Sequence, residues 1–133
     1  MKVVFDTNIL VSALLWRGTP YRCLLAIRAG LAELILSPLI MEEFRDVLCR
    51  KFALTQEDAE ENSAIAQKSA KLINIPGTLR VVPDDPTDDK FVETAIVGGA
   101  QWLVSGDKHL LRLKEYQGIT VISARAFLDL LSQ

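Results

Sequence analysis

Residues 2–16, KVVFDTNILVSALLW, place a short apolar run directly before a helical pattern, with Asp6 at the junction. The β-branched and aromatic residues 2–5 favour a strand, and residues 8–16 favour a helix. The same order of strand and helix continues to the end of the chain. The predicted strands are residues 2–5, 33–36, 79–82, 101–104 and 119–122.

Helix start and stop signals separate these strands. Thr19-Pro20 and Ser37-Pro38 each combine a capping residue with proline at the first helical position, and Thr55 opens a capping box. The predicted helices are residues 8–16, 20–29, 38–51, 56–72, 108–113 and 124–131, with one more from the acidic turn at 83–89 to residue 97.

Strands that alternate with helices imply crossover connections and a mostly parallel sheet with helices on both faces. We therefore predict one α/β domain over residues 1–133, with roughly five strands. Ligands of such sheets bind beyond the carboxyl ends of the strands. Side chains that directly follow a strand are accordingly the first candidates for function.

The composition excludes several classes of protein. Half of the 133 residues are hydrophobic and 24% are charged, but no apolar run reaches the roughly 18 residues of a membrane span. An acid at residue 6 comes too early for a signal peptide, so we expect a cytoplasmic protein. Cys23 and Cys49 lack metal-site spacing and are expected to be reduced core residues. The net charge of −2 decides nothing about nucleic acid.

Two acids directly follow predicted strands. Asp6 ends the first strand, and Asp107 follows residues 101–104 after a Ser105-Gly106 turn in which glycine permits a tight bend. Either acid could cap the next helix or carry chemistry. Thr7 and Asn8 could orient the Asp6 carboxylate or cap the helix.

Helical phase distinguishes Glu43 from Glu42. Glu43 stands three residues after Ile40 and four before Val47, so it lies along the apolar stripe of its helix, whereas Glu42 lies on the solvated side. A carboxylate on a buried stripe costs several kcal/mol unless it is paired or binds a cation. Glu43 is therefore the informative acid of the two.

The turn at residues 83–89, PDDPTDD, holds four acids. Asp85 followed by Pro86 fits a helix cap, and acids there suit the positive end of the helix dipole. Capping does not use all four acids, however. Asp88 is in phase with the apolar face of the following helix, so we favour it for chemistry, with Asp85 and Asp89 as supporting candidates.

Acids that converge on one site must be protonated or bind cations, since like charges repel. Mg²⁺ and Mn²⁺ prefer such oxygen ligands and leave room for water and phosphate oxygens. One or two such ions can drive phosphodiester hydrolysis. His109 is the only histidine, so a zinc site has no support.

Four motifs in order resemble those of PIN domains, in particular the small VapC-like toxins of toxin–antitoxin pairs, and they cover nearly the whole chain. They are residues 4–8, VFDTN; Ser37-Pro38 with Glu43-Phe44; residues 85–91, DPTDDKF; and residues 103–107, LVSGD.

This resemblance implies a three-layer α/β/α sandwich that binds Mg²⁺ or Mn²⁺ and cleaves RNA as an endoribonuclease. It implies a homodimer silenced by an antitoxin protein encoded nearby. Asn8 and Ser105 would support the site. The resemblance assigns the metal to a quartet of acids: Asp6, Glu43, Asp88 and Asp107.

One rival function remains open, and two others are disfavoured by the residues around Asp6. A catalytically silent module that binds metal or RNA would have the same sequence pattern. A phospho-receiver domain would require a pair of acids after the first strand, where Asp6 stands alone. A haloacid-dehalogenase-type phosphatase would require aspartate in place of Asn8. Both functions are therefore disfavoured. For the RNA phosphates, the candidate contacts are the basic residues near the motif ends: Arg17, Arg22, Lys90 and Lys108.

Overall fold

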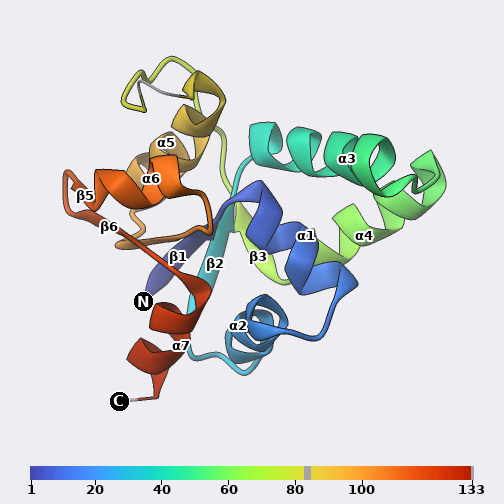
Figure 1. Cartoon of the computed structure of the whole chain (residues 1–133), viewed down its shortest axis with the longest axis horizontal. Coiled ribbons are helices and arrows are strands. Elements are labelled where there is room, and N and C mark those ends of the chain that lie inside the picture. The colour runs from blue at the N-terminus through green and yellow to red at the C-terminus, as the bar shows by residue number, and fades with distance from the viewer. Residues whose placement is uncertain (83–84, 133) are drawn as a thin grey trace.

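A mostly parallel sheet forms the centre of the computed structural model, which describes residues 1–82 and 85–132 (Figure 1). Within these residues the sheet has six strands, in the order β3-β2-β1-β4-β6-β5. Every neighbouring pair is parallel except β5 and β6. The strands are β1 (Lys2–Phe5), β2 (Glu33–Leu36), β3 (Ala70–Leu72), β4 (Trp102–Val104), β5 (Glu115–Tyr116) and β6 (Ile119–Ile122).

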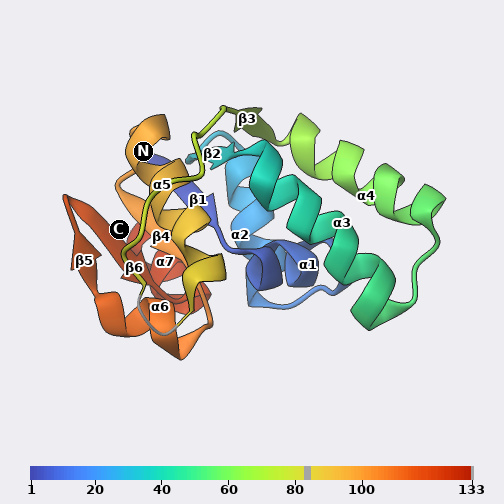
Figure 2. The same ribbon diagram turned by 90° about the horizontal axis from the view of Figure 1, so that it is seen from above.

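Helices lie on both sides of the sheet (Figures 1 and 2). The helix α5 contacts β1, β2 and β4, while α2 packs against α1 and α7. The α-helices are α1 (Thr7–Leu15), α2 (Thr19–Arg28), α3 (Pro38–Phe52), α4 (Gln56–Lys68), α5 (Asp89–Gly98), α6 (Lys108–Leu113) and α7 (Ala124–Leu131), and a short 3₁₀ turn, η1 (Pro86–Asp88), precedes α5.

Burial of the central strands on both faces explains the layers. Val3, Val4 and Phe5 of β1 are all fully buried, although successive side chains of a strand point to opposite faces. Phe5 packs edge-on against Phe127 of α7, with ring centroids 6.5 Å apart. The predicted α/β class with helices on both faces is therefore confirmed.

The third predicted strand is wrong, and the chain forms a different strand at this edge. The helix predicted over 56–72 ends at Lys68, and residues 70–72 pair with β2 as β3. Ala, Lys and Leu are good helix formers, so only the pairing with β2 reveals this strand.

The segment 79–82, predicted as a strand, has no regular structure. Its backbone does not enter the sheet: the N–H groups of Val81 and Val82 donate to the Asp89 carboxylate instead, at 2.8 and 2.7 Å. Residues 83 and 84 of the predicted acidic turn lie outside the described residues. The short β5 was not predicted, which is why the sheet has six strands rather than five.

Two further observations concern composition. Cys23 is buried and Cys49 half-buried, and neither forms a disulfide, as expected for core cysteines. Across residues 1–82 and 85–132, the helices are all too short or too polar to span a membrane.

Candidate metal centre

The candidate centre lies beyond the carboxyl ends of β1 and β4, the two middle strands of the sheet. These strands pair in parallel, with Phe5 opposite Val104, so the segments that follow them leave the sheet side by side. The connections run to opposite sides of the sheet from this point, β1 leading towards β2 and β4 towards β6. Such a switch in strand order creates the crevice in which open parallel sheets bind ligands.

Asp6 follows β1 and is 3% exposed. Its Oδ1 accepts a hydrogen bond from the Ile9 N–H at 2.8 Å, which caps α1, and its Oδ2 accepts one from the Ser105 hydroxyl at 2.5 Å. Burial is the main cause that raises the pKa of Asp6 to about 6, and the two hydrogen bonds offset it only in part. Capping and a place in the centre are therefore compatible in this residue.

Asp107 caps α6 and comes from the segment after β4. Its Oδ1 accepts from the His109 N–H at 2.7 Å, and its own N–H donates to the Ser105 hydroxyl at 2.9 Å. Ser105 thus links Asp6 and Asp107 through its hydroxyl. A Cβ added at Gly106 would meet no other atom within 4 Å, and the residue does not have a positive φ, so the backbone here does not require glycine.

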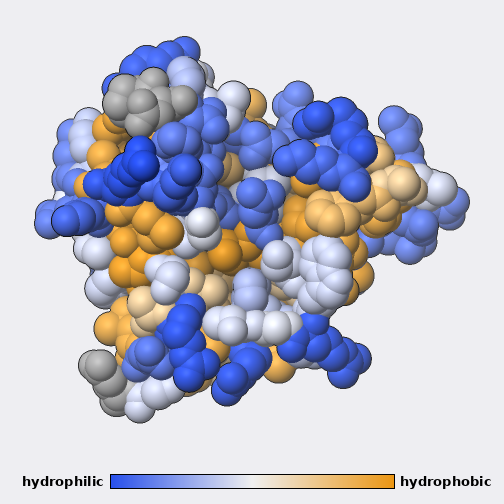
Figure 3. Space-filling view, in the orientation of Figure 1, coloured by the Kyte–Doolittle hydropathy of each residue, from blue (hydrophilic) through white to orange (hydrophobic). Residues whose placement is uncertain are grey.

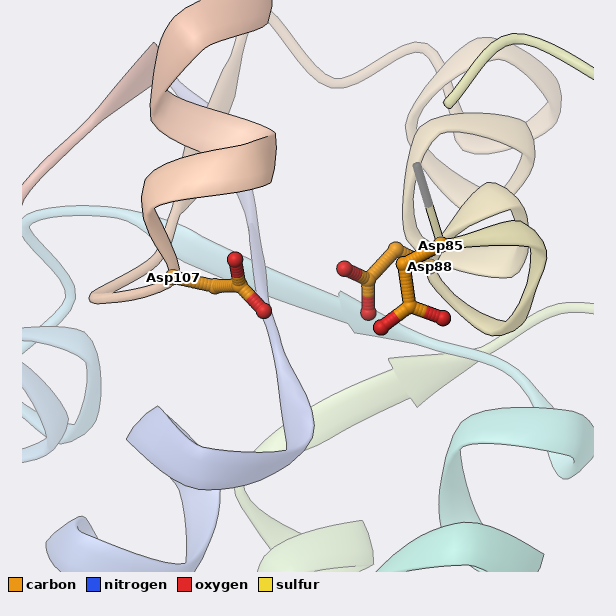
Figure 4. Close-up of side chains that lie close together, drawn as sticks. All are labelled: Asp85, Asp88 and Asp107. Carbon is orange, nitrogen blue, oxygen red and sulfur yellow. The ribbon is translucent and has the colours of Figure 1, made fainter. Parts of the chain in front are cut away.

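Asp85 and Asp88 approach from the start of α5. Asp85 caps η1, because its Oδ1 accepts from the Thr87 N–H and hydroxyl at 3.1 and 2.5 Å. One carboxylate oxygen from each of Asp85, Asp88 and Asp107 lies within 4.8 Å of the others. Figure 4 shows Asp107 on one side of the opening and the two other carboxylates facing it from the opposite side.

Asp88 differs from Asp6, Asp85 and Asp107, whose carboxylates each accept a hydrogen bond from a backbone N–H group. It is 8% exposed, and its buried Oδ2 has no hydrogen-bond partner among the described residues. Burial, followed by the charges of Asp85, Asp107, Asp6 and Glu43 in that order, raises the pKa of Asp88 to about 7. A buried acceptor without a donor costs free energy, which a proton or a cation relieves.

Glu43 lies beside this group but has partners of its own. Its Oε1 accepts a short hydrogen bond from the Thr7 hydroxyl, and its Oε2 forms an ion pair with Lys90 at 2.7 Å. The Lys90 ammonium also donates to the Thr87 carbonyl. Lys90, predicted as an RNA phosphate contact, does not line the pocket of the centre; its side chain, only 14% exposed, is paired with Glu43 instead.

Asp89 points away from the centre, although it is the neighbour of Asp88. Its Oδ1 binds the segment 79–82, and Glu93, one helical turn later, accepts from the N–H groups of residues 77–79 at 3.2–3.5 Å. Both acids are almost fully buried. The supporting place in the centre predicted for Asp89 is therefore not what the structure shows, since its carboxylate is used to hold the preceding segment.

A pocket of about 250 Å³ connects the acids that come from different parts of the chain. In Figure 3 hydrophilic side chains gather over the upper part of the face, where Figure 1 places α3, α5 and α6, and hydrophobic side chains lie below them. The pocket is lined by Asp6, Thr7, Asn8, Glu43, Val47, Arg50, Lys51, Asp85, Thr87, Asp88, Phe91 and Asp107.

The basic residues of the pocket differ from those predicted. The pocket is lined by Arg50 and Lys51, and not by the predicted contacts Arg17, Arg22 and Lys108. Helical phase contained this signal: Val47, Arg50 and Lys51 follow Glu43 by four, seven and eight residues, which is one face of a helix. Thr7 was expected to orient Asp6 or to cap the helix, but its bond to Glu43 had no sequence signal, because it joins residues 36 positions apart.

Two solved structures are similar to this chain in fold. PAE2754 from Pyrobaculum aerophilum is 17% identical and superposes with a TM-score of 0.66, over 99% of this chain and 98% of that one. A chain of VapBC2 from Rickettsia felis, solved bound to a DNA fragment from its promoter, is 16% identical with a TM-score of 0.63, over 92% of this chain and 98% of that one.

The sequence itself gives a more specific result. No curated protein matches it. The family model described as PIN domain matches residues 2–109, which include all the acids of the candidate centre. The chain therefore belongs to the PIN domain family.

Proposed function

We propose that this protein is a Mg²⁺- or Mn²⁺-dependent endoribonuclease that hydrolyses RNA phosphodiester bonds. The observation that carries the proposal concerns Asp88: its buried Oδ2 has no donor in the described residues, and one of its carboxylate oxygens lies within 4.8 Å of oxygens of Asp85 and Asp107. Membership of the PIN family supports the same reaction. Zinc sites use histidine and cysteine ligands, and this chain has one histidine and no clustered cysteines, so the sequence does not support zinc.

The residues present fit a hard divalent cation. Carboxylate oxygens are the ligands that Mg²⁺ and Mn²⁺ prefer, and an acid deprived of donors is stabilised by the added positive charge. We assign the ion to the acids that line the pocket, which include the whole quartet of the resemblance: Asp6, Glu43, Asp88 and Asp107.

The bound metal would supply an activated water and stabilise the leaving oxygen, with one ion or two. The chain's own residues prepare this chemistry. Ser105 and the Ile9 N–H fix the Asp6 carboxylate, and the start of α6 fixes Asp107. Asp88, whose pKa is raised to about 7, would give up its proton to hold the cation.

Contacts with the substrate are assigned to the edge of the pocket. Asn8 is exposed there at the start of α1, and Arg50 and Lys51 lie on the α3 side. Cationic side chains beside an acidic centre neutralise the phosphates of a bound strand and keep it over the metal. This assignment replaces Arg17, Arg22 and Lys108 as the proposed phosphate contacts.

We further propose that the protein acts in the cytoplasm as the toxin of a toxin–antitoxin pair and forms a homodimer. The resemblance of its motifs to VapC-like toxins supports this role, and VapBC2 shares the fold. The expected partner is a small antitoxin protein encoded nearby. Co-expression with the adjacent gene tests it: a stable complex that suppresses cleavage is expected, and free cleavage in the presence of the neighbour's product contradicts it.

Replacement of Asp6 tests the enzymatic proposal. Asp6→Asn should lower Mn²⁺-dependent cleavage of single-stranded RNA by about 100-fold or more, because a charge is lost while asparagine still caps α1. Glu42→Gln, one residue from Glu43 but on the exposed side of α3, is the matched control and should cleave normally.

Cleavage is followed on a labelled single-stranded RNA, with far-UV circular dichroism as the check on folding. Unchanged cleavage by Asp6→Asn, or by the unmutated protein in excess chelator, contradicts the proposal. If the unmutated protein binds Mn²⁺ but cleaves no RNA, the silent metal-binding module becomes the better description.

A further inference from the structure

We propose that Trp16 and Phe52, here called the aromatic pair, form a contact on which a base of single-stranded RNA stacks. The inference rests on the proposed ribonuclease function and adds a substrate contact outside the metal pocket. Neither side chain lines that pocket or carries a charge, so the contact would be made by ring surface alone.

The aromatic pair is exposed, unlike the other phenylalanines of the chain. Trp16 is 52% and Phe52 39% exposed, whereas the four other phenylalanines are 2% exposed or less. The two ring centroids lie 5.4 Å apart at an interplanar angle of 67°, which is an edge-to-face contact. Such a contact covers at most one face of one ring, so aromatic surface is left for another planar group.

The aromatic pair lies at the ends of two helices that line the metal pocket. Trp16 directly follows α1, and Phe52 is the last residue of α3. These helices contact each other (Figures 1 and 2). Asn8 lines the pocket, and Ser12 and Trp16 follow it at intervals of four residues, along one face of α1. The rise from Asn8 to Trp16 is about 12 Å, so an extended strand that leaves the pocket reaches the aromatic pair within a few nucleotides.

Charge favours RNA as the occupant of this surface. Lys51 directly precedes Phe52, lines the pocket and forms no ion pair within residues 1–82 and 85–132. Proteins that bind single strands combine cations that follow the phosphates with aromatic rings on which bases stack. The cores of protein–protein interfaces, by contrast, are depleted in lysine. The aromatic pair beside Lys51 therefore has the composition of a single-strand contact.

Such a contact selects RNA that is unpaired and long enough. The bases of a duplex stack on one another, whereas the bases of a single strand can stack on a ring of the protein. A strand too short to extend from the metal pocket to the aromatic pair gains nothing from it. Because every base has an aromatic face, the contact sets little sequence preference.

RNA binding by the full chain tests the inference, in the Asp6→Asn background that leaves the RNA uncut. The anisotropy of a labelled single-stranded RNA gives the affinity of each variant. Trp16→Ala should weaken binding by about tenfold, the effect of losing one stacked base, and Trp16→Phe, which keeps a ring, by less than about threefold. The slope of log affinity against log salt should not change in either variant, because tryptophan carries no charge.

A second measurement separates stacking from a general loss of affinity. RNAs in which one base is removed at successive positions should include one that binds Asp6→Asn more weakly than the intact strand. The same RNA should show no such loss with the protein that also carries Trp16→Ala, because its stacking partner is already gone. Leu31→Ala is the matched control: Leu31 is exposed but does not line the metal pocket, so the affinity should stay unchanged. Far-UV circular dichroism and urea unfolding check that each variant is folded.

The outcomes separate this inference from the proposed function. If Trp16→Ala binds RNA as tightly as its parent while the unmutated protein cleaves RNA, the inference is overturned and the ribonuclease stands. Loss of antitoxin binding alone in Trp16→Ala would make the aromatic pair a protein contact and would also overturn it. If the chain neither binds nor cleaves RNA, the proposed function fails and the inference fails with it. Weaker binding at an unchanged salt slope, with one base position that depends on Trp16, supports it.

Discussion

Two groups of buried or half-buried carboxylates lie on opposite sides of the start of α5. The anchor acids, Asp89 and Glu93, face backbone N–H groups of residues 77–82, so every charge has donors. The pocket acids, Asp6, Asp85, Asp88 and Asp107, face one another, and Asp88 has an oxygen without any donor among the described residues. Asp88 and Asp89 are neighbours in sequence, yet they belong to different groups.

The two groups differ in what stabilises the carboxylate anion. A carboxylate that accepts several N–H hydrogen bonds is stable as an anion and stabilises the segment that it binds. A buried carboxylate that meets other carboxylates is unstable as an anion until a cation arrives. The anchor acids thus hold the segment that leads to Asp85, and the pocket acids remain available for a metal.

The largest expected effect comes from removing an anchor. Asp89→Ala leaves the buried N–H groups of Val81 and Val82 without an acceptor, which should lower the free energy of unfolding by about 3 kcal/mol. Asp89→Asn keeps an oxygen for both donors and should lose clearly less. Urea denaturation in chelator measures this.

Exposed aspartate provides the control for that prediction. Asp129 on α7 is largely solvent-accessible and pairs only with Arg125, so Asp129→Ala should change the stability by less than about 0.5 kcal/mol. Equal losses in Asp89→Ala and Asp129→Ala would show that the anchor bonds contribute nothing.

The fold was predictable where local signals and burial agree. Phe5 ends a β-branched run and Ser123 opens an amphipathic helix, and both elements form as expected. The edge strand β3 was not predictable, because Lys71 and Leu72 are exposed and only backbone pairing with β2 makes them a strand. Residues 79–82 look like a strand but give their N–H groups to Asp89.

The site was predictable as far as strand ends and helical phase reach. Asp6 and Asp107 were selected because they follow predicted strands. Asp88 was favoured over Asp89 from helical phase, and in the structure the two side chains point to different sides of α5. Bonds between distant residues were out of reach. Glu43 and Lys90 are 47 residues apart in the sequence, and neither helix has a pattern that predicts their ion pair.

Removing a pocket acid should have the opposite sign from removing an anchor. Asp88→Asn should stabilise the metal-free protein by about 2 kcal/mol at pH 8, because a buried anion next to other anions is replaced by a neutral amide. The unmutated protein should regain this difference when Mn²⁺ is added, since the ion binds only the folded state. Urea denaturation with and without Mn²⁺ measures both effects.

The same gain should depend on pH in a defined direction. The pKa of Asp88 rises from 3.8 to about 7 on folding, so below about pH 4 the carboxyl is protonated in both states and costs nothing. The cost grows as pH rises to about 7 and is complete above it. The advantage of Asp88→Asn should therefore fade on acidification. A constant advantage from pH 5 to pH 8 would contradict the raised pKa.

Metal affinity should follow the same protons. Mn²⁺ must displace a proton from Asp88 and, at lower pH, from Asp6, whose pKa values are raised to about 7 and about 6. Acidification from about pH 8 to about pH 6 should therefore weaken Mn²⁺ binding by about tenfold. The pH dependence should be shallower in Asp88→Asn. Binding that does not change over this range would separate the ion from both acids.

The smallest effect concerns the basic edge of the pocket, which is formed by Arg50 and Lys51. Lys51 and Arg50 should each neutralise about one RNA phosphate, so replacing Lys51 by alanine should reduce the slope of log affinity against log salt by about 0.7 for single-stranded RNA. Arg50 shares its charge with Asp46 at 2.6 Å, so Arg50→Ala should reduce the slope less. Binding is measured in the Asp6→Asn background, which leaves the RNA uncut.

Arg22 provides the control, because it does not line the pocket. Arg22→Ala should therefore leave the slope of log affinity against log salt unchanged. If Arg22→Ala reduced the slope more than Lys51→Ala, the RNA would instead be bound along α2.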